Sequence, residues 1–180
     1  ITHDMGVIAE TADRVAVIAA GRIVDGVLAQ SEREAQALWA LRENISEAQK
    51  IEGISIKHDV SVPVSAIPAF LETADAALAS AFPGIRVVAF GHVGDGNLHY
   101  NLSKPDAQEN STFIAAQPGV NRIVHDVVHA LNGSISAEHG IGQLKRDEIL
   151  RYKSPVEMAL MRTLKQAIDP QGLMNPGKVV

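Results

Sequence analysis

The chain has 180 residues, with 16 Lys and Arg against 21 Asp and Glu, a net charge of −5, and 46% apolar residues. This composition excludes a disordered chain and allows one full hydrophobic core. Because no basic run is present, nucleic acid is not an expected partner. No apolar window approaches the ~20 residues that span a bilayer, and no signal peptide is visible, so we expect a cytoplasmic protein without integral membrane contact. The absence of cysteine excludes disulfides and thiolate metal sites.

The first quarter of the chain predicts two extended segments followed by a helix. Residues 14–24 are rich in β-branched side chains with a break at Ala20–Gly21, which favours a strand, a turn and a second strand. Ser31 is a candidate N-cap because Glu34 follows at capping-box spacing. A helix is then expected to about Lys50. Its apolar stripe consists of Leu38, Leu41 and Ile45.

The rest of the chain alternates short strands with helices. A strand over 57–62 is ended by Pro63, and the Asp95–Gly96 reversal predicts a hairpin of strands 86–92 and 97–103. Helices are expected over 65–80, 115–131, 143–151 and 155–168, and a further strand over 134–138. This order predicts an α+β domain with a mostly antiparallel sheet and helices packed on one face.

The hairpin carries the densest polar constellation, GHVGDGNLHYN over residues 91–101. Strand alternation places His99 and Asn101 on one face, opposite Leu98, Tyr100 and Leu102. The reversal brings His92 back toward His99, and two imidazoles from facing strands match metal-ligand geometry. The alternative is an ordinary hairpin with two histidines on its solvent face.

A third metal ligand is offered where the strand over 134–138 runs into a glycine-rich break. Glu138 and His139 lie at that point, in SAEHGIG. Two imidazoles and one carboxylate, with coordination positions left open, are typical of a catalytic metal site. The alternative is a simple capped strand end.

Arg42 falls on the apolar stripe of its helix, and Ser46 follows one turn later on the same face. A guanidinium that faces the core must be paired, because an unpaired buried charge is very costly. Its partner could be a protein carboxylate or a bidentate substrate carboxylate. Lys57 could supply a second positive charge. Periodicity does not choose between these interpretations.

Other polar and sulfur-containing positions favour structural interpretations. His125 and His129 form HDVVH, which lacks the glutamate base of the HExxH zinc motif, so a solvated helix face is expected. His58 is interpreted as structural. Packing roles are expected for Trp39, Met158 and Met161.

Five motifs in order, ALWALRENISEAQK, KHDVSVP, GHVGDGNLHYN, SAEHGIG and NPGK, resemble the C-terminal domain of FAD-linked oxidases over residues 25–180. That family includes D-lactate dehydrogenases, the glycolate oxidase FAD subunit and D-2-hydroxyglutarate dehydrogenase. The resemblance implies FAD-dependent oxidation of a small D-2-hydroxy acid to a 2-oxo acid. It also implies a divalent metal, zinc or manganese.

The resemblance also implies roles for individual residues. It makes His139 the proton acceptor and a substrate contact. The metal ligands would be His92, His99 and Glu138. The remaining substrate contacts would be Arg42, Ser46, Lys57 and Asn101. The terminal Asn175 and Lys178 would lie near the flavin.

Two departures from the family pattern are expected. The FAD-binding domain would precede this segment and is absent, so the chain alone should lack a hydride acceptor and be inactive. Residues 1–24 instead resemble the end of an ABC-transporter ATPase, with His3 at the switch-loop position and a junction near Arg22–Gly26. The alternatives are therefore a non-catalytic metal-binding remnant and an ABC-transporter ATPase fragment.

Overall fold

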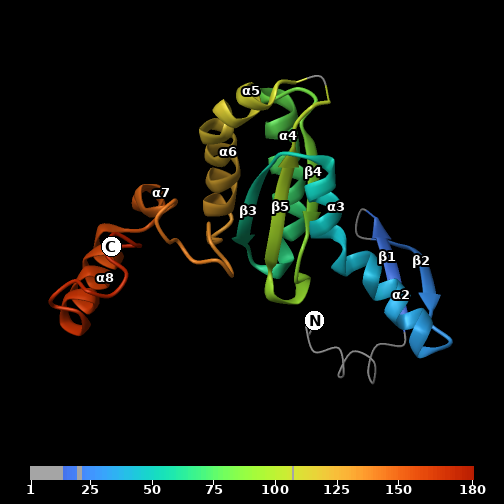
Figure 1. The fold of residues 1–180 in the computed structure, drawn as a ribbon, viewed down its shortest axis with the longest axis horizontal. Coiled ribbons are helices and arrows are strands. Elements are labelled where there is room, and N and C mark those ends of the chain that lie inside the picture. Colours follow the sequence, from blue (N-terminus) through green and yellow to red (C-terminus); the bar gives the residue numbers. More distant parts are fainter. Residues whose placement is uncertain (1–13, 20–21, 107) are drawn as a thin grey trace.

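The computed structural model describes residues 14–19, 22–106 and 108–180. An antiparallel hairpin of β1 (Arg14–Ala19) and β2 (Arg22–Leu28) comes first, as the β-branched content predicts. Helices α2 (Glu32–Glu43) and α3 (Ile45–Glu52) then lead to the central sheet (Figure 1). Most of residues 1–24, which were predicted to resemble an ATPase, including His3, lie outside the described residues.

The central sheet consists of β3 (Ser55–Ser61), β4 (Arg86–Phe90) and β5 (Asn97–Ser103). Its order is β3-β5-β4 and both pairings are antiparallel. The predicted hairpin is therefore confirmed, with β5 in the middle. In the β3–β5 register, Asp59 lies opposite His99 and Lys57 opposite Asn101. Side chains of these four residues consequently share one face of the sheet.

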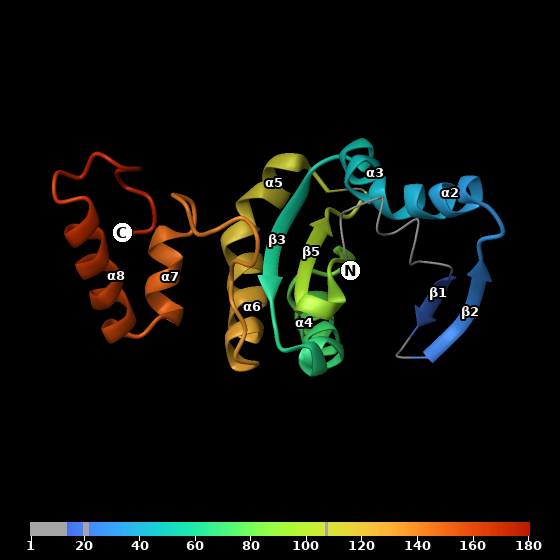
Figure 2. The ribbon, with the colours of Figure 1, turned by 90° about the horizontal axis from the view of Figure 1, so that it is seen from below.

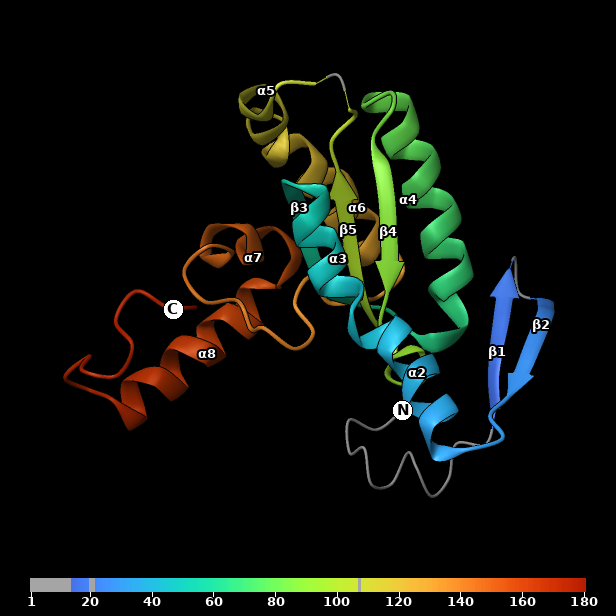
Figure 3. The ribbon, with the colours of Figure 1, turned by 45° about the vertical axis from the view of Figure 1, so that its right-hand side comes forward.

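Helices cover the other face of this sheet (Figures 2 and 3). A 3-10 turn η1 (Val64–Ala66) precedes α4 (Ile67–Ala81), and α5 (Asn110–Ala115) precedes α6 (Gln117–Ala130). The core between sheet and helices is formed by apolar side chains, among them Val60, Phe70, Leu78, Tyr100, Leu102, Val120 and Val124. The predicted α+β fold, with an antiparallel sheet and helices on one face, is confirmed.

The C-terminal helices lie at the opposite end of the molecule from β1 and β2 (Figure 1). Helix α7 (Arg146–Tyr152) is short, and α8 (Pro155–Ile168) begins with a capping box between Ser154 and Glu157. Met158 is the residue that α8 buries. Among the described residues, no helix combines the length and the apolar character that crossing a membrane requires.

Three expected elements differ in the structure. Residues 134–138 are not a strand, because only an isolated bridge joins Ser134 to Ser61 and the following N–H groups turn to a side chain of β3. The helix expected to Lys50 is divided at Asn44 into α2 and α3. The helix expected over 115–131 begins at Gln117 as α6, with Pro118 in its first turn where no N–H donor is needed, and the separate short helix α5 before it was not expected.

The apolar stripe of α2 does not face a core. Within residues 32–43, all of which the structure describes, no side chain is buried, and Leu41 is 74% exposed. The capping of this helix is confirmed, since Ser31 Oγ accepts the Glu34 N–H at 3.3 Å. Periodicity therefore identified the helix correctly but not its packing.

Candidate functional site

The turn between β4 and β5 places His92 beside the open face of the sheet. The turn η2 (Val93–Asp95) ends at Gly96, whose φ is +70°. A Cβ at Gly96 would lie 2.1 Å from the carbonyl oxygen of Val62, so only glycine fits this reversal. The Asp95 and Asn97 N–H groups both donate to the His92 carbonyl, which closes the turn. His92 itself is buried, at 4% exposure.

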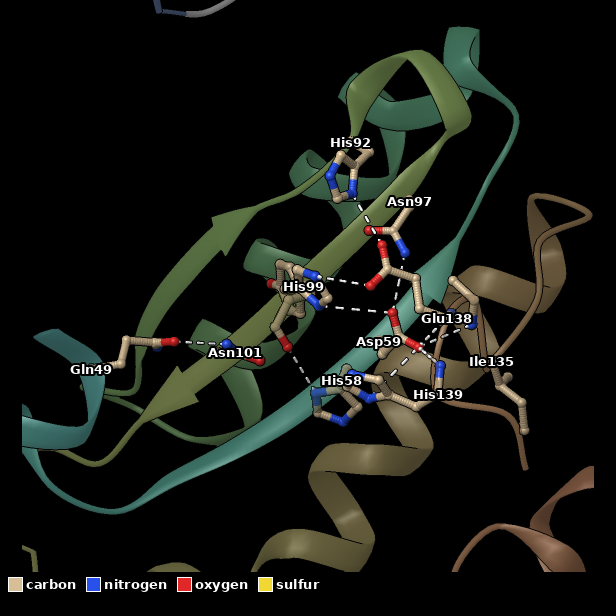
Figure 4. Close-up of polar contacts among 12 residues, drawn as sticks. Gln49, His58, Asp59, His92, Asn97, His99, Asn101, Ile135, Glu138 and His139 are labelled. Atoms are coloured by element: carbon tan, nitrogen blue, oxygen red, sulfur yellow. Dashed lines mark hydrogen bonds and ion pairs between the residues drawn. The ribbon is translucent and has the colours of Figure 1, made fainter. Parts of the chain in front are cut away.

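Three of the predicted residues converge on this face (Figure 4). His92 Nδ1 lies 3.0 Å from Glu138 Oε1, and His99 Nε2 lies 3.8 Å from Glu138 Oε2. The Glu138 carboxylate therefore bridges the two imidazoles. The hairpin supplies both histidines, and the segment after the Ser61–Ser134 bridge supplies the carboxylate.

Asp59 adds a second carboxylate beneath this group. Ligand atoms of Asp59, His99 and Glu138 all lie within 4.8 Å of one another. Asp59 Oδ1 is 3.7 Å from His99 Nδ1, and Asp59 is only 3% exposed. The sequence analysis did not include Asp59. The signal was present, because Asp59 alternates with Lys57 along β3 and so shares its face.

A cavity of about 540 Å³ opens beside these residues. Its size is that of a small-ligand site. It is bounded by α3, by the open face of β3 and β5, and by residues 139–145. Of the predicted substrate contacts, the lining includes Ser46, Lys57, Asn101 and His139, which the structure therefore brings together.

Two further lining residues were not predicted. Gln49 Oε1 accepts the Asn101 Nδ2 hydrogen at 2.7 Å, while the buried Gln49 Nε2 has no partner among the described residues. Lys145 Nζ donates to the Ile135 carbonyl at 2.7 Å. Gln49 follows Ser46 at helical spacing, a signal that could have placed it on the same face. Lys145 comes from beyond the glycine break, where periodicity gives no signal.

Arg42 lies beside this cavity rather than in its lining. Its Nη2 is 3.3 Å from His92 Nε2, and its Nη1 is 3.2 Å from Glu43 Oε1. Its side chain is 30% exposed, so the expectation that this guanidinium faces a core is wrong. The pairing with a protein carboxylate is the alternative that the structure contains.

Burial and charge together set the protonation of the site. Burial lowers the pKa of the His99 imidazole, although the carboxylates of Glu138 and Asp59 oppose this shift. Burial would raise the pKa of Asp59, but hydrogen bonds from the backbone of His139 and Glu138 outweigh it and hold that pKa below its usual value. A neutral imidazole and an ionised carboxylate are the forms that favour cation binding.

Sequence comparison identifies the family. The model of the C-terminal domain of FAD linked oxidases matches residues 4–179. The chain belongs to this family. It is 46% identical over 159 residues to a D-2-hydroxyglutarate dehydrogenase of Stutzerimonas stutzeri, and 47% identical over 159 residues to one of Xanthomonas citri. A mitochondrial D-2-hydroxyglutarate dehydrogenase of Bos taurus is 38% identical over 164 residues.

These alignments cover 88%, 88% and 91% of the present chain, but 34%, 34% and 29% of the relatives. The chain thus spans about a third of the length of the curated relatives that it matches. This FAD-linked oxidase domain is correspondingly related to one part of each longer enzyme.

The donor set of this FAD-linked oxidase domain fits a divalent metal. Two imidazoles and a carboxylate are ligands suited to zinc or manganese. The two oxygens of the Glu138 carboxylate face His92 Nδ1 and His99 Nε2, and among the described residues the group whose ligand atoms lie within 4.8 Å of one another is Asp59, His99 and Glu138.

The C-terminal tail returns toward the cavity. Lys178 Nζ donates to Gln143 Oε1 at 2.8 Å, and Gln143 lines the cavity. The Val179 N–H donates to the Gly142 carbonyl at 2.9 Å. Asn175 adopts a φ of +48° in the turn before these contacts. Lys178 is therefore close to the cavity through Gln143, and Asn175 belongs to the same turn.

His125 is not on a solvated helix face, as the sequence analysis expected. It is 2% exposed, and its Nδ1 lies 3.3 Å from Glu148 Oε1 because α7 packs over this part of α6. The structural interpretation of His58 agrees with its contacts. His58 Nδ1 donates to the Tyr100 carbonyl at 2.9 Å, and its ring meets that of His125 at 5.6 Å.

Proposed function

We propose that this chain is the substrate- and metal-binding domain of an FAD-dependent D-2-hydroxy acid dehydrogenase that oxidises a 2-hydroxy acid to a 2-oxo acid. The observation that carries the proposal is the convergence of His92, His99 and Glu138 beside the cavity lined by Lys57 and His139. The similarity to D-2-hydroxyglutarate dehydrogenases favours D-2-hydroxyglutarate as substrate over D-lactate. Two cationic groups, Arg42 and Lys57, agree with a dicarboxylate.

In this proposal, His92, His99 and Glu138 hold a divalent cation, zinc or manganese. Such a cation supplies Lewis acidity, which lowers the pKa of the substrate 2-hydroxyl group. Glu138 is 44% exposed and His99, which lines the cavity, is 18% exposed. The chain therefore contributes three ligands and leaves room for substrate oxygens.

His139 accepts the hydroxyl proton in this proposal. Its side chain is 69% exposed and its ring stacks with that of His99, with centroids 6.0 Å apart. The ring is thus next to the proposed ligands and open to the cavity that it lines. A histidine with access to the reacting hydroxyl is the usual general base at neutral pH.

The cavity walls would orient the substrate. Lys57 on β3 lies opposite Asn101 on β5, and Ser46 on α3 lines the same cavity. An ammonium group, a hydroxyl and an amide can hold a carboxylate at several points, which fixes C2 relative to His139. Arg42 contributes charge from beside the cavity, and it would have to leave Glu43 or His92 to contact substrate directly.

FAD is the hydride acceptor in this proposal and is bound mainly by a separate flavin-binding domain. Asn175 and Lys178 would face the flavin from the tail that returns to Gln143. Helix α8 offers a docking surface, defined by four exposed apolar side chains at i, i+4 spacing: Val156 at 77%, Leu160 at 58%, Leu164 at 53% and Ile168 at 71% exposure. We call this surface the α8 ridge.

Metal content tests the ligand assignment. The purified chain should bind about one zinc or manganese per chain, and His99→Ala should lose it, measured by elemental analysis after dialysis. His129→Ala is the matched control, because His129 is an exposed histidine on α6. Equal metal content in the chain and in His99→Ala would contradict the assignment.

Turnover tests the activity and the base. The chain is joined to the flavin-binding domain of an FAD-linked oxidase and assayed with D-2-hydroxyglutarate and D-lactate and a dye acceptor. We expect turnover of D-2-hydroxyglutarate that falls at least ~100-fold in His139→Ala, within the range that general base catalysis contributes. Near-full activity in His139→Ala would refute the base assignment. Metal binding without turnover of any D-2-hydroxy acid would instead favour a non-catalytic metal-binding module.

A further inference from the structure

The Asp59 carboxylate contacts several groups of the site. Its Oδ2 accepts the backbone N–H groups of Glu138 at 2.7 Å and His139 at 2.8 Å, with that of Ala137 at 3.3 Å. Its Oδ1 accepts the Asn97 Nδ2 hydrogen at 3.2 Å and faces His99 Nδ1 at 3.7 Å. One buried carboxylate thus contacts the backbone of Glu138 and His139 and faces the ring of His99, that is, two proposed metal ligands and the proposed base (Figure 4).

We propose that Asp59 is a positioning residue of the metal and substrate site, which holds the Glu138–His139 backbone and the His99 ring, and that it is not a metal ligand. The proposal deepens the proposed function and rests on it for the identity of the ligands. It assigns a role to a side chain that no step of the reaction uses.

The hydrogen bonds of Asp59 argue against a ligand role. Three N–H groups converge on Oδ2, and an amide donor and an imidazole edge face Oδ1. A cation bound to either oxygen would compete with these donors, and backbone N–H groups freed in this way would lose their hydrogen-bond partner. Glu138 has no such constraint, because its carboxylate is 44% exposed and faces the two imidazoles.

The segment that Asp59 holds has little other support. Residues 137–139 belong to no helix or strand. Their backbone contacts with β3 are the isolated bridge between Ser61 and Ser134 just before them and the Ala137 N–H, which also donates to the Asp59 carbonyl at 3.2 Å. Gly133 permits that approach, because a Cβ there would lie 2.3 Å from the Ser61 carbonyl oxygen. Beyond the bridge, the Asp59 carboxylate is what fixes the N–H groups of Glu138 and His139. Their side chains consequently project from an anchored backbone.

Asp59 also lies at ion-pair distance from the His99 ring. Since Asp59 faces Nδ1, the other ring nitrogen, Nε2, points to Glu138 and is the one available to a cation. A carboxylate behind a ligating histidine fixes its tautomer and orientation, and loss of such a partner typically costs about 10- to 100-fold in metal affinity.

The test compares Asp59→Asn with Asp169→Asn. Asp169 is a matched control, because it is 7% exposed and accepts the N–H groups of Leu173 and Met174, both at 2.9 Å, at the end of α8. Both variants lose a buried carboxylate that accepts backbone N–H groups. Co²⁺ titration followed by visible absorption gives the affinity and, at saturation, a spectrum that reports the ligand set.

We expect Asp59→Asn to bind Co²⁺ about 10- to 100-fold more weakly, with the native spectrum restored at saturation. Asp169→Asn should bind like the native chain. Native affinity in Asp59→Asn would overturn the proposal, as would equal losses in the two variants. An altered spectrum at saturation would make Asp59 a ligand and would overturn it too.

Amide hydrogen exchange provides a second readout that needs no metal. In the native chain, the Glu138 and His139 amides should be protected although their side chains are exposed, and Asp59→Asn should remove that protection. Unprotected amides in the native chain would overturn the proposal even if Asp59→Asn failed to fold. If the native chain binds no metal but these amides are protected and lose protection in Asp59→Asn, the proposed metal function fails and the positioning role of Asp59 stands.

Discussion

The two faces of the central sheet carry opposite kinds of chemistry. The face under α4 and α6 buries Tyr100, Leu102 and Val60 completely, and the helices add Phe70 and Leu78. The open face carries Lys57, Asp59, His99 and Asn101 beside a cavity. Strands β3 and β5 each contribute to both sets, because successive side chains of a strand alternate between faces.

The two faces of strand β5 therefore have different roles: one contributes to the stability of the fold and the other to the candidate site. Apolar burial on the helix face is the main source of folding free energy, whereas polar groups on the open face contribute little to it. The ligands can therefore be varied on a scaffold whose core is unchanged. This holds only if substitutions on the open face leave the packing of the helix-covered face intact.

The largest expected effect lies on the helix face. Phe70 is fully buried, and its ring meets that of Tyr100 edge to face, with centroids 5.1 Å apart. We expect Phe70→Ala to lower the free energy of unfolding by about 3–5 kcal/mol, since it leaves a cavity in the core. Urea unfolding of the metal-free chain measures this loss.

Phe90→Ala is the matched control on the open face. Phe90 is half-buried and its ring lies 5.1 Å from that of His99. It should cost less than half as much unfolding free energy as Phe70→Ala. Equal losses of unfolding free energy in the two variants would show that the open face contributes as much to stability as the helix-covered face.

Alternation explains what the sequence could reveal about these faces. Leu98, Tyr100 and Leu102 were assigned correctly because period 2 is a strong signal in an isolated strand. The approach of His92 to His99 was also foreseen, since the Asp95–Gly96 pair marks the hairpin. The family resemblance placed Glu138 with them.

Other features depended on long-range contacts that a local pattern does not encode. Asp59 reaches residues 137–139 across 78 to 80 positions in the sequence. His125 is buried because α7 packs over it, and the apolar stripe of α2 has no core to face. Helical periodicity shows which side chains share a face, whereas the neighbour of that face is decided by the tertiary fold.

The second prediction concerns two histidines on the helix face. Burial lowers the pKa of His58 from 6.5 to about 4, with a further contribution from His125, whose own pKa is lowered by burial. The unfolded chain therefore binds more protons than the folded chain between these pH values. The free energy of unfolding should be highest above pH 6.5 and should fall as the pH drops toward 4. The shift of the His58 pKa accounts for about 3 kcal/mol of this fall.

Urea unfolding at several pH values between 7 and 4.5 measures this dependence. His58→Gln should flatten the curve over that window, because it removes the imidazole that must stay neutral in the fold. His129→Gln is the control, since His129 is exposed on the same helix as His125. A curve as steep in His58→Gln as in the native chain would assign the pH dependence to other groups.

The smallest effect on stability is expected at the α8 ridge, which extends the comparison beyond the sheet. Leu160 and Leu164 are more than half exposed, so Leu160→Lys and Leu164→Lys should change the unfolding free energy by no more than about 0.5 kcal/mol. Met158→Ala, on the buried side of the same helix, should cost ~2 kcal/mol or more of unfolding free energy.

A surface that adds nothing to the stability of the chain alone is free to bind a partner. The lysine variants should therefore weaken association with a flavin-binding domain, measured by sedimentation of the mixed proteins, while Ile114→Lys alters an exposed apolar side chain of α5, outside both the ridge and the cavity, for comparison. If the lysine variants instead unfold the chain, α8 packs more tightly than its exposure indicates; if association is unchanged, the flavin partner contacts another face.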